Sequence, residues 1–320
     1  MAQQNHSRIS LDGTNGEERA RNLLLQRWLS DEMDGLVPES MERADTHDVL
    51  HVACGTGEWL FDLARTHPHI QFVSIERAEG SIRTAETLAR REGIQNVTLL
   101  AQDLTHCDTH LFPCTGFDVI NVAFLGEYLL TIDYGAFAQS LWAVCRPGGM
   151  VHWLEGELPI TNSSACEALT TKLCQALQAA GHSFIPPSLQ EIAEIFARWQ
   201  QQAGYTVRPY ERRTLGITPM LGHWLRKAGF QHISNMPYAI EVSAGIKAHS
   251  HFVQLALAFS RQIKPFLLRT GVIDEAALEK LIHQMEGELQ APTFCGMCFL
   301  LRANGQKLEA PGCQRDNSMC

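Results

Sequence analysis

The chain has 320 residues, 45% of them hydrophobic, and a formal net charge of −9 at pH 7. This length and hydrophobic content suffice for one large core, with room for a smaller lobe. The acidic balance and the lack of a Lys/Arg run argue against a nucleic-acid-binding surface. No uncharged apolar run approaches the roughly 20 residues that a membrane span needs.

The N-terminus and the cysteines are those expected of a cytoplasmic protein. The first 18 residues are polar, so no signal peptide is predicted. Ten cysteines are scattered through apolar elements, which is typical of small buried side chains in a reducing compartment. Cys295 and Cys298 have CxxC spacing, but they lie in an apolar run, and neither a second pair nor a His cluster completes a metal site. We therefore predict no metal centre.

A helix is expected over 17–33, and a strand, a glycine turn and a helix follow it. Residues 49–52 are mostly apolar and β-prone, as in a strand buried in a parallel sheet. Gly55 and Gly57 then allow a tight turn, and 58–66 has apolar residues at helical spacing. Such a unit aims backbone N–H groups at a nucleotide-like ligand. The turn alone is weak evidence, because any tight strand-to-helix turn can use glycine.

Strands and helices alternate as far as residue 155, which predicts an α/β fold with a parallel sheet. Strands are expected over 70–75, 96–101, 117–122 and 150–154, helices over 78–92 and 134–144, and a turn over 146–149. The alternation then breaks. Helices are expected over 163–180, 189–202, 218–228, 248–269 and 274–290, and strands within 230–242 and over 293–302.

These elements suggest five segments along the chain. They are an N-terminal helical cap (1–45), a ligand-binding core (46–155), a helical lid insertion (156–215), the rest of the core with a two-helix insertion at about 245–290 (216–302), and a tail (303–320). No internal repeat and no low-complexity segment interrupts them.

Two carboxylates follow consecutive strands beyond the glycine turn. Glu76 ends the second strand, 19 residues after Gly57, where an acid can accept hydrogen bonds from the two hydroxyls of a ribose. Asp103 follows the third strand, where a carboxylate can accept from an adenine amino group. Either acid alone could be a solvated strand end. Both together, after a glycine turn, indicate a site for an adenosine-like molecule.

Six segments occur in an order and at a spacing that resemble the class I S-adenosylmethionine-dependent methyltransferases. They are VLHVACGTGEWLFDLA, VSIERAE, AQDLT, FDVINVAFL, VCRPGGMVHWLEGE and LRKAGF. The resemblance covers roughly residues 17–302. It implies a Rossmann-like, mostly parallel seven-stranded sheet with the last strand (293–302) antiparallel, helical lid segments, and S-adenosyl-L-methionine as the cofactor.

The resemblance also implies which residues hold the cofactor. Gly55 and Gly57 would lie beside its methionine and ribose, Glu76 would hold the ribose hydroxyls, and Arg77 would lie beside the adenine. The family pattern also implies that Asp103 and Leu104 flank the adenine and that Asn121, Val122 and Ala123 line the methionine side. Further cofactor-binding positions that it implies are His51, Ala53 and Cys54.

The sequence departs from the family pattern at two of these positions. The family usually has an acid where His51 stands, and a neutral imidazole can form a hydrogen bond but cannot attract an ammonium group as a carboxylate does. Ala53 replaces the first glycine of the turn, which is expected to matter little provided that its φ angle is negative.

Candidate catalytic residues on the acceptor side follow the fourth and fifth strands, because ligands bind at the carboxyl ends of strands in open α/β sheets. They are Glu127, Tyr128 and Glu155, with Glu157 as a further candidate; each could instead solvate a loop or cap a helix. His152 lies within a strand, so we interpret it as a core histidine. Other residues could either line a lid or pack in the core: His182, His223, Trp28, Phe184, Trp199, Tyr205 and Trp224.

The leading hypothesis is a methyltransferase that acts on the O, N or C atom of a small organic acceptor, in specialised metabolism. Nucleic acid and membrane are not expected as partners, and a homodimer is left open. One alternative is an enzyme of the same fold that uses the cofactor for a rearrangement or cyclisation without methyl transfer. Another is a non-catalytic binding protein. A nicotinamide dehydrogenase fits least, because Leu60 stands where GxGxxG requires glycine.

Overall fold

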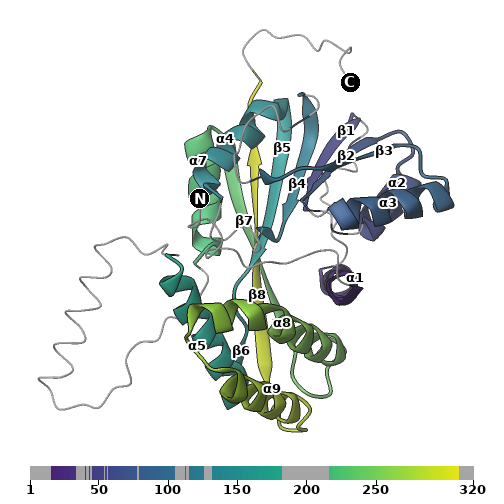
Figure 1. Cartoon of the computed structure of the whole chain (residues 1–320). Coiled ribbons are helices and arrows are strands. Elements are labelled where there is room, and N and C mark those ends of the chain that lie inside the picture. Colours follow the sequence, from purple (N-terminus) through teal and green to yellow (C-terminus); the bar gives the residue numbers. More distant parts are fainter. Residues whose placement is uncertain are drawn as a thin grey trace, which may run out of the picture.

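A single sheet of eight strands organises the chain (Figure 1). The computed structural model describes residues 16–33, 40, 43, 45–53, 55, 57–77, 79–104, 112, 115–125, 132–181 and 216–309. The strand order is β3-β2-β1-β4-β5-β8-β6, with β7 also paired to β8. The strands are β1 (Asp48–Val52), β2 (Gln71–Glu76), β3 (Val97–Ala101), β4 (Phe117–Ala123), β5 (Cys145–Gly156), β6 (Ile160–Thr161), β7 (Gln231–Glu241) and β8 (Gly296–Gln306).

The predicted α/β class with a mostly parallel sheet is confirmed. β1, β2, β3, β4 and β5 pair in parallel, whereas β8 is antiparallel to β5 and to β7. The last strand is therefore antiparallel, as expected. The count differs by one, because the two-residue strand β6 pairs with β8 as an eighth strand. So short a strand has no periodicity that a sequence pattern could reveal.

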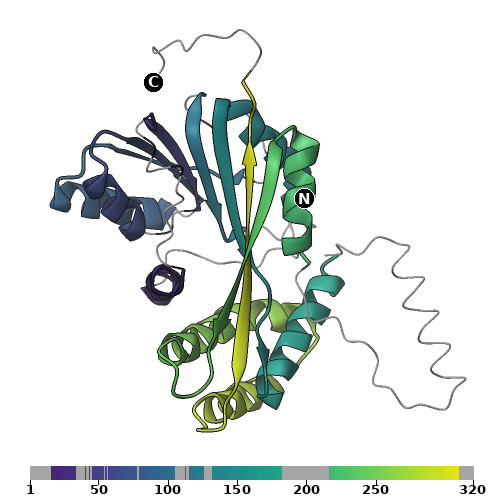
Figure 2. The ribbon, with the colours of Figure 1, turned by 180° about the vertical axis from the view of Figure 1, so that it is seen from behind.

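Helices cover both faces of the parallel strands (Figures 1 and 2). On one face, α2 (Glu58–Thr66) packs on alternate residues such as Val49 and Phe72, and α3 (Glu79–Glu92) lies beside it. On the other face, α4 (Tyr134–Val144) and α7 (Leu221–Ala228) pack on Leu50 and Val52. Because successive strand residues point to opposite faces, one β-strand supplies both cores.

A helical lobe lies beyond the carboxyl ends of the parallel strands (Figure 1). β7 and β8 extend into it, and it contains α5 (Ser164–Ala179), α8 (His249–Thr270) and α9 (Glu275–Leu289). The N-terminal helix α1 (Gly16–Glu32) lies against α8. Trp28 and Leu29 of α1 belong to the same apolar cluster as the buried residues of α5, α8 and α9. The lobe thus faces the sheet edge at which ligands bind in open α/β folds.

Several predicted boundaries are wrong at strand ends. The segment 146–149, predicted as a turn, is the start of β5, which begins at Cys145. β8 continues to Gln306, four residues into the predicted tail, because its partners in β5 and β7 supply hydrogen-bonding positions there. The helix expected over 218–228 begins as a 3₁₀ turn, η5 (Thr218–Met220), before α7. The helix expected over 189–202 lies outside the described residues.

No metal or membrane feature is found in the part of the chain that the structure describes. No group of three or more His, Cys, Asp or Glu side chains in it is placed to hold a metal ion, and no helix in it is long and apolar enough to cross a membrane. Cys295 is exposed just before β8, whereas Cys298 is buried within it.

A buried chain of hydrogen bonds contains His152 and confirms that it is a core histidine. Its Nδ1 lies 2.7 Å from Oδ1 of Asn304, and its Nε2 lies 2.6 Å from Oγ of Ser40. Because the Asn304 oxygen is an acceptor only, Nδ1 carries the proton and Nε2 accepts from the Ser40 hydroxyl. Burial lowers the pKa of His152 to about 4. The network therefore joins β5, β8 and the segment before β1 around a neutral imidazole.

The free energy of unfolding is expected to fall as the pH falls from 7 to 5. An unfolded chain protonates His152 near pH 6.5, whereas the folded chain does so near pH 4, so the stabilisation is complete above pH 6.5 and is lost toward pH 4. The loss between pH 7 and pH 5 is about 2 kcal/mol for this residue. Urea unfolding of wild type and His152→Gln at both pH values measures it. The variant should lose this share of the pH dependence, and equal pH dependence in both proteins would contradict the network.

Candidate functional site

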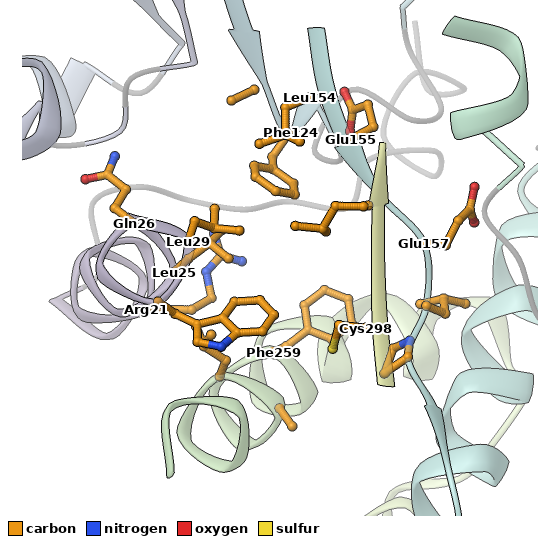
Figure 3. Close-up of a pocket in the computed structure, with 18 of the residues that line it drawn as sticks. Arg21, Leu25, Gln26, Leu29, Phe124, Leu154, Glu155, Glu157, Phe259 and Cys298 are labelled. Atoms are coloured by element: carbon orange, nitrogen blue, oxygen red, sulfur yellow. The ribbon is translucent and has the colours of Figure 1, made fainter. Parts of the chain in front are cut away.

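One cavity of about 400 Å³ joins the glycine turn to the helical lobe (Figure 3). Its volume is within the range of small-molecule sites. Its sheet side is lined by His51, Ala53, Gly55, Trp59, Glu76, Ser81, Asn121, Ala123, Phe124, Leu154 and Glu155. Its lobe side is lined mainly by apolar residues, which include Leu25, Trp28, Leu29 and Met33 of α1, Leu169 and Leu173 of α5, and Phe252, Leu255, Phe259 and Ile263 of α8.

The turn after β1 has the backbone shape that a ligand site at a helix start requires. Gly55 and Gly57 have φ angles of 57° and 79°. A Cβ atom at Gly57 would lie 3.1 Å from the Phe61 ring, so a side chain would crowd the turn. Gly57 caps α2 without a side chain that could occupy the first N–H groups of the helix. These donors are therefore left for a ligand.

Two residues other than glycine adopt the left-handed conformation at strand ends that line the cavity. Ala53 has a φ of 65°, which corrects the expectation of a negative angle, and Phe124, after β4, has a φ of 52°. This conformation costs roughly 1–2 kcal/mol for a residue with a Cβ atom. Such strain concentrates at functional sites. At Phe124 the bend precedes Leu125, whose N–H points at Glu155.

Glu76 is buried at the end of β2 and faces the cavity beside the turn. Its side chain is 7% exposed, and Oε2 accepts a hydrogen bond of 3.0 Å from the Gly55 amide. One carboxylate oxygen thus fixes the turn. A carboxylate has about four acceptor sites, so Glu76 can also accept hydrogen bonds from a ligand.

His51 is held as a neutral side chain between β1 and β4. Its Nδ1 lies 2.9 Å from Nδ2 of Asn121, and its ring centroid lies 4.9 Å from that of Trp59. Burial lowers the pKa of His51 to about 4. If Nδ1 accepts from the Asn121 amide, the proton is on Nε2, and the ring offers the cavity a donor where the family pattern has an acid.

Glu155 is the buried acid at the carboxyl end of β5. Its Oε1 accepts hydrogen bonds of 3.0 Å from the Leu125 amide and from Nε1 of Trp153. Its pKa is raised to about 7, chiefly by burial and in smaller part by the nearby Glu157 carboxylate, whereas the two hydrogen bonds act to lower it. Figure 3 shows Glu155 at the sheet end of the cavity, close to Phe124 and Leu154. A carboxyl group with this pKa can exchange a proton with a ligand near neutral pH.

The other predicted residues have varied positions. Glu157 also lines the cavity, but it accepts hydrogen bonds from Thr218 and Gly216 and so anchors the start of η5. Val122 and Leu104 are buried in the core, and His223 is exposed away from the cavity. Arg77 and Asp103 are half-buried and are not among the lining residues. Cys54, Glu127, Tyr128, His182, Phe184, Trp199 and Tyr205 lie outside the described residues.

Sequence reasoning missed most of the lobe side of the cavity. α8 and α9 contribute Phe252, Leu255 and Met285, and α5 contributes Leu169. All lie on apolar helix faces, and the same pattern is found whether a face packs on a core or on a cavity. Trp28, which was expected to be core or acceptor wall, is both buried and cavity-lining, whereas Trp224 stacks on Tyr134 in the core.

Comparison with known proteins identifies the sheet region. Residues 44–202 match the family model described as "Methyltransferase domain". A curated relative, the demethylmenaquinone methyltransferase of Lactococcus lactis subsp. lactis (strain IL1403), is 26% identical over 112 residues. The match covers 35% of this chain and 42% of that protein. Less than half of the relative's length is therefore matched, and its acceptor cannot be transferred to this chain.

Solved structures of similar fold include two with low sequence identity. The phosphoethanolamine N-methyltransferase 2 of Haemonchus contortus, in complex with phosphomonomethylethanolamine and S-adenosylhomocysteine, is 14% identical with a TM-score of 0.44, covering 91% of this chain and 53% of that one. The YcgJ protein of Bacillus subtilis is 13% identical with a TM-score of 0.46, covering 85% and 96%. Likeness at these TM-scores says nothing of the acceptor. On the family match and the sheet topology, the chain belongs to the class I S-adenosylmethionine-dependent methyltransferases, with S-adenosylmethionine as its cofactor.

Proposed function

We propose that the protein transfers a methyl group from S-adenosylmethionine to a small, largely apolar acceptor in specialised metabolism. The observation that supports this most is the continuity of one cavity from the glycine turn and Glu76 to an apolar chamber with Glu155 at the boundary. A donor site and an acceptor site that share one cavity bring two reactants together without solvent between them.

The residues at the sheet end fit the cofactor. Glu76 would accept hydrogen bonds from the ribose hydroxyls while its Oε2 keeps the Gly55 amide in place. Asn121 and His51 would hydrogen-bond the methionine part from the ends of β4 and β1. When bound, S-adenosylmethionine supplies a methyl group on a positively charged sulfur atom.

We assign the proton-accepting role to Glu155. The acceptor atom of an alcohol, phenol or acidic C–H compound has to lose a proton as it gains the methyl group, and the buried carboxylate lies at the cavity wall to accept it. The hydrogen bonds from Leu125 and Trp153 orient its Oε1. A pKa near 7 leaves a useful fraction of the base ionised at neutral pH while keeping it basic.

Trp153→Phe is expected to shift the pH–rate profile upward by one to two pH units. The indole N–H stabilises the charged form of Glu155, so its loss raises the pKa above about 7, and a hydrogen bond to a charged group contributes about 1.5–3 kcal/mol. Initial rates from pH 5.5 to 9.5 measure the shift, with Trp142→Phe, a half-exposed tryptophan away from the cavity, as the matched control. An unchanged profile in Trp153→Phe would remove Glu155 from this role.

We also propose that the helices around the chamber form its lid. α1, α5 and α8 supply most of its apolar lining, and they belong to the segments 1–45, 156–215 and 245–290, which lie outside the parallel strands. Exclusion of water at this boundary strengthens the electrostatic interactions of Glu76 and Glu155.

Mass spectrometry of both products tests methyl transfer against its alternatives. The protein is incubated with methyl-labelled S-adenosylmethionine and a panel of apolar alcohols, phenols and acids. Methyl transfer predicts a labelled product with one added methyl group and an equal amount of S-adenosylhomocysteine. A changed acceptor with intact cofactor would favour the rearrangement or cyclisation. Cofactor binding with no turnover across the panel would favour the binding protein.

A further inference from the structure

Two residues of the cavity lining, Arg302 and Trp28, each have a buried nitrogen donor without an acceptor. Nε of Arg302 and Nε1 of Trp28 are buried, and neither has a hydrogen-bond partner among the residues that the structure describes. Both side chains line the cavity, and Trp28 is only 4% exposed. Buried N–H groups are rarely left unpaired in folded proteins, because they lose their bonds to water without replacement. Both N–H groups require an acceptor, which a carboxylate, carbonyl or hydroxyl oxygen can supply.

Among the described residues, the guanidinium group of Arg302 has a thioether and an aromatic ring as its partners. Its Nη2 lies 3.6 Å from Sδ of Met236, and its Cζ lies 5.5 Å from the ring centroid of Tyr238. It forms no ion pair with an acid within the described ranges. The guanidinium, which is charged at any physiological pH, is therefore neutralised by no carboxylate of that part of the chain.

Three other charged side chains that line the cavity are engaged. Arg21 of α1 donates a hydrogen bond to Gln262 of α8, and Glu157 binds Thr218. Glu155 uses Oε1 for two donors, and the charge that acts on it is that of Glu157. Arg302 thus differs from Arg21, Glu155 and Glu157 in having no oxygen or nitrogen partner within the described residues.

Arg302 lies two strands away from Ala123, which lines the sheet side of the cavity. In the sheet, Leu154 of β5 lies opposite Ala123 of β4 on one side and opposite Arg302 of β8 on the other. Neighbouring strands are about 4.8 Å apart, so Arg302 lies about 10 Å from Ala123 across the sheet. Leu300 and Arg302 are two residues apart in β8, so both lie on the strand face that lines the chamber. If the acidic group of a ligand bound Arg302, the apolar part of that ligand would lie among α1, α5 and α8.

We propose that Arg302, with Trp28, forms a carboxylate-binding subsite, and that the acceptor is an apolar carboxylic acid. A carboxylate can accept hydrogen bonds from two N–H groups of a guanidinium and from an indole N–H. The rest of the chamber is apolar and can hold a hydrocarbon chain. This inference rests on the proposed function, since it names the acceptor class for the same cavity. Its test measures binding and not turnover, so that it can fail independently of methyl transfer.

The probe pair is decanoate and decanol, which share a hydrocarbon chain and differ in the anionic head. Each is titrated calorimetrically into the full-length protein saturated with S-adenosylhomocysteine. Wild type is expected to bind decanoate on the order of tenfold or more tighter than decanol, since a hydrogen bond to a charged group contributes about 1.5–3 kcal/mol. Equal affinities for both probes would overturn the subsite and leave methyl transfer standing.

Variants assign the preference to the two residues. Arg302→Gln should reduce the decanoate preference to within about twofold while decanol binding is retained, and Arg302→Lys should keep part of it. Trp28→Phe should weaken decanoate binding by about threefold to tenfold and leave decanol binding unchanged. Arg261→Gln, on an exposed position of α8, is the matched control and should retain the full preference. A full preference in Arg302→Gln would overturn the proposal, as would its complete loss in Arg302→Lys with the fold intact.

Discussion

Replacing Glu155 by glutamine is expected to lower kcat by about 10²–10⁴-fold, which is the usual contribution of a general base. The amide has nearly the same shape and keeps an oxygen for the Leu125 and Trp153 donors, but it cannot take up a proton. The KM for the cofactor should change little, because Glu76 and the glycine turn remain. In wild type the rate should rise with pH through about 7 and then level off. The rise should be absent in the variant.

The stability of Glu155→Gln separates a catalytic defect from a folding defect. Because burial raises the folded-state pKa of Glu155 to about 7, the neutral acid stabilises the fold below its unfolded-state pKa, and this contribution is lost as the pH rises through 7. The variant should therefore be at least as stable as wild type above pH 7, as measured by urea unfolding. Glu241→Gln, at an exposed position of β7, serves as the control for both measurements. A folded Glu155→Gln variant with full activity would rule out the base.

Replacing Glu76 by alanine is expected to weaken S-adenosylhomocysteine binding by about 10²–10⁴-fold. Two hydrogen bonds from ribose hydroxyls to a carboxylate contribute about 3–6 kcal/mol together. The substitution also removes the acceptor of the Gly55 amide at 3.0 Å, so the turn loses its anchor as well. Titration calorimetry measures the dissociation constant directly, without any knowledge of the acceptor.

A neighbouring acid provides the control for Glu76. Glu79 begins α3 three residues later, its side chain is 76% exposed, and its ion pair with Arg83 lies at the surface. Glu79→Ala should bind S-adenosylhomocysteine as wild type does, whereas Glu76→Gln, which keeps one acceptor oxygen, should fall between wild type and Glu76→Ala. Unchanged affinity in a folded Glu76→Ala protein would mean that the ribose lies elsewhere.

The parallel part of the fold could be predicted because its signals are local. Apolar runs bounded by glycine, proline or charge give the strands, and the bounds of α2 (Glu58–Thr66) and α4 (Tyr134–Val144) agree with the expected ones. The acid at Glu76 could be placed from its spacing to the glycine turn, since both features lie within one βαβ unit. Segment 146–149 shows the limit: its Pro-Gly-Gly composition favours a turn, but it belongs to β5, at the point where the register between β4 and β5 shifts.

The chamber could not be predicted, because it depends on which distant residues meet. The hydrogen bond from the Leu125 amide to Glu155 and the position of Arg302 opposite Leu154 depend on how the strands are paired. Sequence spacing does not fix the register across the 139 residues between β5 and β8. The left-handed φ of Ala53 is set by the same context, since alanine itself disfavours it. Glu127 and Tyr128, predicted beside Glu155, lie outside the described residues and stay predictions.

A crystal structure with bound S-adenosylhomocysteine tests the central claim most directly. We expect the ribose hydroxyls to bind the Glu76 carboxylate and the sulfur atom to face the chamber bounded by Glu155 and Leu154 (Figure 3). The remaining volume of the cavity, among α1, α5 and α8, would then be open to the acceptor. A cofactor bound with its sulfur turned away from this chamber, or outside the cavity altogether, would contradict the account.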